Sequence, residues 1–130
     1  QPLSHEFVDR GDTIMLNVEY FGIQRTIHME SAVDPETVEP SPLGYSVGRW
    51  EGNTLVVETT QINYPYSSAG GARQSEDVRV VERFAMSDDQ AQLDFNITIY
   101  DDIAFDGPAT YGRLYVALGE PFVPLDCTVF

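Results

Sequence analysis

The chain has 130 residues, of which 42% are hydrophobic, enough for one packed domain over residues 1–130. Its 21 acidic residues against 7 basic ones give a net charge of −14. A surface of this sign repels the phosphates of nucleic acids and anionic lipids, so neither is expected as a partner. No apolar run approaches the roughly 20 residues of a membrane-spanning helix, so no membrane insertion is expected. The single cysteine, Cys127, cannot form an internal disulfide and has no neighbouring histidine to activate it.

Apolar residues recur at every second position along most of the chain, which is the pattern of a strand with one buried face. Residues 14–20 show it first, and residues 23–29 repeat it after Gly22. Three prolines then fall within residues 31–44. Because proline removes a backbone donor, this segment is predicted to be a loop.

The next segment predicts a β-hairpin. Residues 45–50 and 54–60 have the composition of strands, and Glu51-Gly52-Asn53 lies between them. Glycine and asparagine tolerate the positive φ of short hairpin turns, so the turn is predicted at this tripeptide. Leu55-Val56-Val57 is apolar on both faces, which predicts a strand that is covered on both sides or bent.

The second half of the chain continues the strand pattern. After a polar loop at residues 62–74, strands are predicted at 76–86 and 91–101, and again at 111–118 and 122–130. Strict alternation within the strand at 91–101 separates two faces. The residues predicted to be buried there are Leu93, Phe95, Ile97 and Ile99, and those predicted to be more exposed are Asp94, Asn96 and Thr98.

About eight strands joined mostly by short turns, with no convincing amphipathic helix, predict an all-β fold. An antiparallel meander of this size has two edge strands, and closing the sheet into a barrel removes them. We therefore expect a small, lipocalin-like barrel of about eight strands, whose interior holds packed side chains or one small ligand. A two-sheet β-sandwich is the alternative.

The segment from Gly44 to Thr60 carries a family resemblance. It reads G-Y-S-V-G-R-W-E-G-N-T-L-V-V-E-T-T and resembles the segment G-H-S-V-G-x-W-E-G-D-T-L-V-V-x-T of a widespread family of small exported bacterial proteins. The resemblance continues at Arg25–Met29, Ser75-Glu76 and Val80–Phe84, and so covers most of the chain from Arg25 to Asp101. It implies an exported bacterial β protein, periplasmic or secreted, and indicates little about a reaction.

Three positions depart from the pattern of that family. The family commonly has aspartate where this chain has Asn53, histidine where it has Gln74, and Asp-Gly where it has Glu30-Ser31. If the family uses an acid–base pair at these positions, this chain lacks part of it. The departures therefore weaken a catalytic interpretation.

Arg25 and Glu82 are the main candidates for a site. Arg25 lies in phase with Ile27, and Glu82 with Phe84, so both charges fall on faces that are otherwise apolar. A charge on such a face has to be paired or lie in a wet cavity, because desolvating it alone is costly. Arg25 and Glu82 therefore form either an ion pair that fixes strand register, or part of a ligand cavity in which Arg25 binds a carboxylate or polarises a carbonyl. The two side chains are predicted to point into the barrel and to interact.

Aromatic side chains complete the predicted pocket. Trp50, Tyr64, Tyr66 and Tyr115 are candidate ligand-binding residues, together with Arg25 and Glu82. The loop that carries Tyr64 and Tyr66 is predicted to act as a lid. Trp50 also fits the role of a core anchor, because it ends the first strand of the hairpin.

Other polar residues give weaker indications. His28 is a candidate general base near neutral pH, but it lies on the opposite phase from Arg25 and is expected to face outwards. The pairs Asp88-Asp89 and Asp101-Asp102 do not lie in a calcium loop of the EF-hand kind and are expected to be solvated turn residues. Neither a metal nor a cofactor is predicted.

Three functions remain open from the sequence. The first is a binding barrel for an apolar or carboxylate-bearing small molecule. The second is a cofactor-free isomerase, cyclase or lyase that uses Glu82 or His28 as its base, and the third is a structural module of a cell-envelope assembly. A roomy interior of mixed polarity favours binding, whereas a closed apolar interior favours a structural role. A cavity carboxylate with a raised pKa favours catalysis. Neither the ligand nor the oligomeric state follows from the sequence.

Overall fold

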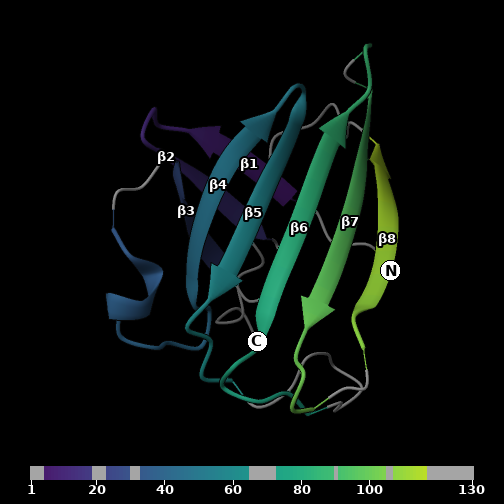
Figure 1. Cartoon of the computed structure of the whole chain (residues 1–130). Coiled ribbons are helices and arrows are strands. Elements are labelled where there is room, and N and C mark those ends of the chain that lie inside the picture. The colour runs from purple at the N-terminus through teal and green to yellow at the C-terminus, as the bar shows by residue number, and fades with distance from the viewer. Residues whose placement is uncertain are drawn as a thin grey trace, which may run out of the picture.

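The computed structural model describes residues 5–18, 23–29, 33–64, 73–89, 91–104 and 107–116. They form one eight-stranded sheet that curls into a half-barrel, with β8 at one edge (Figure 1). This confirms the predicted eight-stranded, barrel-like all-β fold. In chain order the strands are β1 (His5–Asp9), β2 (Thr13–Val18), β3 (Ile23–Met29), β4 (Tyr45–Glu51), β5 (Thr54–Thr60), β6 (Arg79–Met86), β7 (Gln92–Tyr100) and β8 (Ala109–Val116).

Neighbouring strands pair in chain order, and every pair is antiparallel except β3 and β4, which run parallel. The prediction of a purely antiparallel meander is therefore wrong at this place. A tight turn cannot join parallel strands. The chain between Met29 and Tyr45 is long enough to return to the end of the sheet at which β3 begins, so that β4 runs in the same direction as β3. Its described part contains the 3-10 turn η2 (Pro35–Thr37), and Ser41 beyond it pairs with Ile62.

The β4–β5 hairpin turns where the sequence predicts. Glu51 pairs with Thr54, so Gly52 and Asn53 are the two residues of the loop. Gly52 has φ = 61°, which glycine adopts without the steric cost that other residues meet. This confirms the predicted turn.

The hydrophobic core lies on the concave face of the sheet, where alternate residues of β2, β3, β5 and β6 meet. The buried core residues are Ile14, Leu16, Ile27, Leu55, Val57 and Phe84. Val56 points to the convex face and is nonetheless fully buried, flanked in the ladder by Arg49 and Arg83. Long arginine stems can cover an apolar neighbour while keeping their charge in water. The strand at Leu55-Val56-Val57 is therefore covered on both sides, as one of the two alternatives predicted.

Two strand boundaries differ from the prediction. Strand β1 was not predicted, although its residues pair with those of β2 from His5↔Val18 to Asp9↔Ile14. Strand β6 begins at Arg79 rather than at residue 76. The backbone turns just before it, where the Asp77 N–H donates to Ser75 Oγ and the Val78 N–H donates to the Ser75 carbonyl.

The burial predicted for the strand at 91–101 is correct for one residue and too strong for three. Only Ile99 is fully buried, and the other three apolar residues are half-buried. Thr98 is half-buried as well, so it does not differ clearly from its apolar neighbours. The reason is position, because β7 lies next to the edge strand of an open sheet. The predicted strand at 122–130 lies outside the described residues.

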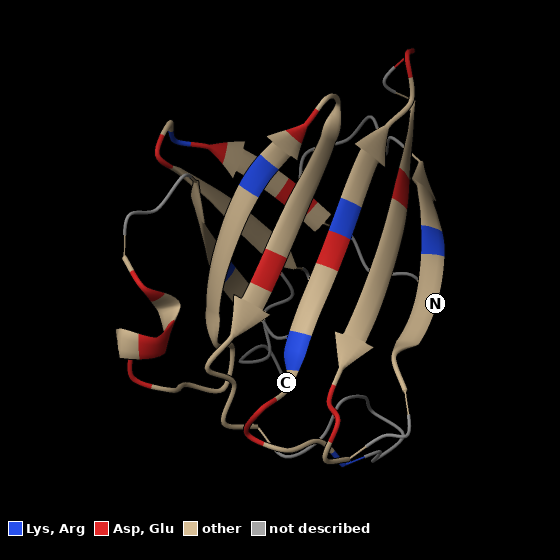
Figure 2. Cartoon of the chain, in the orientation of Figure 1, with Lys and Arg blue, Asp and Glu red and all other residues tan. Residues whose placement is uncertain are grey.

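Acidic residues recur in the turns and loops around the sheet and also lie within β5, β6 and β7, whereas basic residues lie within β3, β4, β6 and β8 and in the turn between β1 and β2 (Figure 2). Within the described part of the chain, no helix is long and apolar enough to cross a membrane.

Candidate functional site

A small cavity of about 70 Å³ opens on the concave face. One water molecule needs roughly 10–15 Å³ on this measure, so the cavity has room for several waters or one compact group of a ligand. It is well below the ~300 Å³ at which ordinary ligand pockets begin. The residues that line it are His5, Phe7, Leu16, Val18, Arg25, Glu82, Phe84, Leu93, Phe95 and Tyr115.

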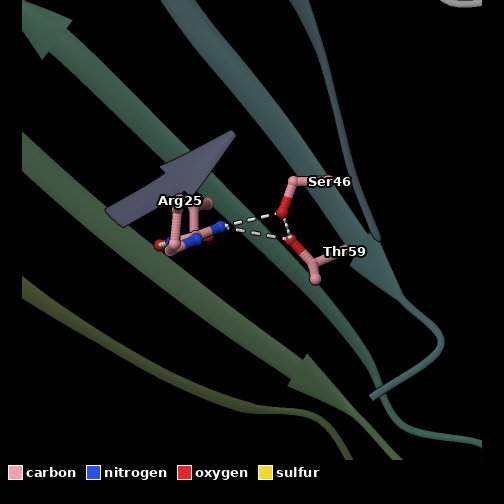
Figure 3. Close-up of polar contacts among 4 residues, drawn as sticks. Arg25, Ser46 and Thr59 are labelled. Carbon is pink, nitrogen blue, oxygen red and sulfur yellow. Dashed lines mark hydrogen bonds and ion pairs between the residues drawn. The ribbon is translucent and has the colours of Figure 1, made fainter. Parts of the chain in front are cut away.

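Arg25 and Glu82 form a bidentate ion pair on the cavity wall. Arg25 Nη1 donates to Glu82 Oε2 at 3.0 Å, and Nη2 donates to Oε1 at 2.7 Å. Nη2 also donates to Ser46 Oγ at 3.1 Å and to Thr59 Oγ1 at 3.3 Å, and these two hydroxyls lie 2.7 Å apart (Figure 3). The predicted interaction between Arg25 and Glu82 is confirmed, and both side chains reach the interior.

Four successive strands, β3 to β6, each supply one member of this network. Ser46 and Thr59 are direct ladder partners, and Arg25 stands two residues before Ile27, the ladder partner of Ser46. Glu82 is likewise the ladder partner of Val57, and Val57 stands two residues before Thr59 in β5. Steps of two residues keep side chains on one face of a sheet. The register alone therefore gathers the four polar groups on the concave face.

The ion pair is largely shielded from water. Only 17% of the Arg25 side chain and 8% of the Glu82 side chain are exposed. Two buried charges remain tolerable when they neutralise each other and their remaining donors find partners, as Ser46 and Thr59 provide here. Arg25 is thus not a free cation for a ligand carboxylate, and Glu82 is not an unpaired base.

Aromatic rings form the opposite part of the cavity. Phe84 lies at the centre, with ring centroids 5.1 Å from Phe7 and 4.9 Å from Phe95. Tyr115 of β8 lies 6.3 Å from Phe95 and 4.9 Å from the His5 ring of β1. These are ordinary distances for favourable aromatic contacts. The two edge strands therefore meet through side chains across the interior.

The Tyr115 hydroxyl lies in an electrostatically mixed environment. Burial raises the pKa of Tyr115 and the negative charge of Glu82 adds to this effect, whereas the Arg113 guanidinium lowers it. The net result is a pKa above the ordinary value for tyrosine. Tyr115 is thus a neutral hydrogen-bond donor at the cavity at physiological pH.

The predicted ligand-binding residues separate into two groups. Arg25, Glu82 and Tyr115 line the cavity, whereas Trp50 does not. Trp50 is 59% exposed near the hairpin turn, so the alternative role of core anchor is wrong as well. It lies in phase with the buried Ser46 and Gly48, but near the end of β4, where the last three residues of the strand are exposed.

The predicted lid is only partly described. Tyr64 is exposed, and its carbonyl accepts a hydrogen bond of 2.7 Å from Gln74 Nε2. Tyr66 lies outside the described residues. Tyr64 does not line the cavity, so the described end of the loop does not form a lid over it.

Sequence reasoning missed the contribution of β1 to the cavity. His5 and Phe7 enter it from a strand that was not predicted. The two apolar residues of that strand, Phe7 and Val8, are adjacent, so the segment lacks the alternation that predicted the other strands. Leu93 and Phe95 were assigned to the correct face without a place in the site.

The remaining polar candidates lie outside the cavity. His28 stacks on Tyr45 at 4.6 Å between ring centroids, and it is not among the cavity residues. Asp101 was predicted to be a solvated turn residue, and this prediction is wrong, because the residue is only 3% exposed. Its carboxylate accepts hydrogen bonds from Ser75 N, Ser75 Oγ, Ile103 N and Ala104 N. Asp89 is exposed, as expected. In the described ranges, no three His, Cys, Asp or Glu side chains gather as they would around a metal ion.

Comparison with known proteins assigns no family to the chain. No protein-family model, curated protein or solved structure matches it. The family resemblance of residues 44–60 therefore stays a prediction, and the site is interpreted from its own chemistry.

Proposed function

We propose that this protein binds a small, largely apolar molecule in the concave cavity. The observation that carries the proposal is the composition of the cavity wall, in which three phenylalanine rings and three aliphatic side chains surround one neutralised ion pair. Ligand pockets typically combine apolar and aromatic walls with a few fixed polar groups. The half-barrel provides both in one place.

The size of the cavity limits the ligand. About 70 Å³ holds one ring or a short chain, and a larger ligand would extend outward. The mouth permits this, because Phe7 is partly exposed and Tyr115 is only half-buried. The part of the ligand that enters the cavity is expected to be uncharged, because Glu82 already satisfies Arg25.

The ion pair between Arg25 of β3 and Glu82 of β6 also supports a binding role over a catalytic one. Glu82 accepts two hydrogen bonds from Arg25, so removing a proton from a substrate would require breaking a buried bidentate pair. His28, the other candidate base, lies outside the cavity. A binding role requires neither group to change its protonation state.

We propose further that the protein works outside the cytoplasm, in the periplasm of a bacterium or after secretion. The support is the sequence resemblance of residues 44–60 to exported proteins. Fractionation of cells that make the native protein, followed by immunoblotting, tests this. Recovery in the cytoplasmic fraction would contradict the location and leave the binding proposal intact.

Titration with phenylacetamide, followed by 1H–15N NMR, tests the binding proposal. We expect amide shifts at Leu16, Phe84 and Phe95 that saturate with the probe. Leu93→Trp should fill the cavity and weaken binding at least about tenfold, a loss of roughly 1.4 kcal/mol. Leu114→Trp is the matched control, because Leu114 lies on the opposite face of the neighbouring strand and is exposed. Equal binding by both variants, or shifts confined to the convex face, would refute the proposal.

A further inference from the structure

Strand β8 carries an arginine, Arg113, near the cavity-lining Tyr115. Strand β8 presents Tyr111, Arg113 and Tyr115 at alternate positions, which places them on one face. Arg113 is the ladder partner of Phe95, and Phe95 lines the cavity. Arg113 therefore belongs to the concave face, at the edge strand of the sheet (Figure 1).

Arg113 differs from the other arginines of the sheet in its partners. Arg25, Arg49, Arg79 and Arg83 each form an ion pair with a glutamate. Among the residues that the structure describes, no carboxylate pairs with Arg113. The chain has three times as many acidic as basic residues, 21 against 7, so carboxylates are plentiful elsewhere. Among the described residues, the concave side of β8 thus carries a guanidinium that has no carboxylate partner.

The guanidinium and the cavity are close enough to share one ligand. Arg113 stands two residues before Tyr115 on the same face of β8, and Tyr115 lines the cavity. The Tyr115 hydroxyl makes no hydrogen bond within the described part of the chain, so its proton is available to an acceptor. Tyr111, on the other side of Arg113, is also partly exposed. Two phenols and a guanidinium are all hydrogen-bond donors.

We propose, on the basis of the binding function above, that the ligand carries one carboxylate that Arg113 and Tyr115 hold at the β8 side of the mouth. The apolar part of the ligand occupies the aromatic cavity, and its acidic group stays at the partly solvated rim. A guanidinium fork matches the two oxygens of a carboxylate. The ligand class is therefore a small aromatic or aliphatic carboxylic acid.

This assignment moves the anion-binding role from Arg25 to Arg113. Arg25 is buried and neutralised by Glu82, so a carboxylate placed there would meet a second carboxylate in a dry site. Arg113 is exposed and lies on β8, an edge strand of the sheet. Because the net charge of −14 repels anions at long range, binding of an acid requires such a local cation.

Phenylacetate and phenylacetamide, which differ mainly in charge, form the probe pair for a calorimetric titration of the full chain. We expect wild type to bind phenylacetate about tenfold more tightly than phenylacetamide, a difference of roughly 1.4 kcal/mol. Arg113→Gln should abolish this preference, because it removes the guanidinium that pairs with the carboxylate of phenylacetate. Arg49→Gln removes the same charge from the convex face and should retain the preference. Raising the salt from about 0.02 M to about 0.5 M should reduce it, since an exposed charge pair is screened.

The two proposals fail in different ways. If both probes bind equally in wild type, or Arg113→Gln keeps the preference, the assignment of Arg113 is wrong and the cavity function stands. If neither probe binds wild type, the cavity function is wrong and the assignment of Arg113 fails with it. Thermal melts of the two variants confirm that each is folded, as expected for substitutions of exposed residues.

Discussion

The centre of the sheet and its β7–β8 edge follow the same alternating pattern but differ in burial. In β5, Val57 is fully buried and Leu55 is 3% exposed. In β7, Leu93 and Ile97 are only half-buried, although they occupy equivalent concave positions. In β8, Tyr111 on the same face is exposed. Alternation therefore predicts which face a residue occupies, whereas burial depends on whether another strand lies across the interior.

The concave and convex faces of the sheet also differ in how their charges are paired. At the centre, Arg25 and Glu82 are enclosed and form a bidentate pair with two supporting hydroxyls. On the convex side, Arg49 and Arg83 share Glu51, with about half of each side chain exposed. Exposed pairs of this kind contribute little to stability, because water solvates either partner well. The concave pair is therefore expected to contribute to the stability of the fold, whereas the convex pairs are not.

The largest effect is expected from Glu82→Ala. Removal of the carboxylate leaves the buried Arg25 guanidinium without a counter-charge, which should lower the free energy of unfolding by about 3–5 kcal/mol. Urea denaturation of the variant and of wild type measures this difference in the free energy of unfolding. The control is Glu51→Ala on the convex face, where no resolvable change is expected.

A double variant separates the charge from the packing. Arg25→Met combined with Glu82→Leu should be more stable than Glu82→Ala alone, because no unpaired charge remains. A Glu82→Ala protein as stable as wild type would show that the pair contributes nothing to the fold.

The next effect compares two leucines. Leu55→Ala creates a cavity in the core and should cost about 2–5 kcal/mol. Leu114→Ala, at a side chain that is 56% exposed on the outer face of β8, should change stability by less than about 0.5 kcal/mol. Chemical denaturation of both variants measures the difference. Similar losses would mean that another part of the protein covers the outer face of β8.

A smaller effect is expected from Asp101, which ties the segment before β6 to the end of β7. Burial raises the pKa of Asp101, but the hydrogen bonds from Ser75, Ala104 and Ile103 outweigh it, so the pKa lies below its ordinary value. A lowered folded-state pKa adds stability that is present above the unfolded value, about 3.9, and is lost as the pH falls through the folded one.

Asp101→Asn should therefore lower the free energy of unfolding at pH 7 by about 2 kcal/mol, since it weakens charge-assisted hydrogen bonds. The gap between the variant and wild type should close as the pH falls from about 5 towards the folded-state pKa. Urea denaturation across that range checks both statements. A gap that stays constant with pH would show that the charge of Asp101 does not stabilise the fold.

Local signals made much of the centre predictable. Gly52 identified the hairpin turn, and the in-phase charges at Arg25 and Glu82 identified the buried pair. Both follow from short-range rules, because turn chemistry and two-residue periodicity act within a few residues. The parallel pairing of β3 with β4 could not be predicted this way, since it depends on where a long connection returns the chain.

The site was less predictable than the fold because it depends on contacts across the half-barrel. Trp50 and Phe7 are both aromatic strand residues, yet only Phe7 lies opposite Phe84. Nothing in the local sequence distinguishes them. The sequence likewise did not indicate Arg113 as a candidate. Its proposed role in binding a carboxylate rests on the lack of a carboxylate partner among the described residues and on its neighbour Tyr115.

The central claim is that ligands bind to the concave face, and intermolecular nuclear Overhauser effects test it most directly. With a methyl-labelled protein and saturating phenylacetamide, we expect contacts from the phenyl protons to the methyl groups of Leu16, Val18 and Leu93, which line the cavity. We expect none to Val47 or Leu114, whose ladder partners Glu58 and Asp94 lie on the convex face. Contacts to Val47 or Leu114, without contacts to the cavity methyl groups, would contradict the claim.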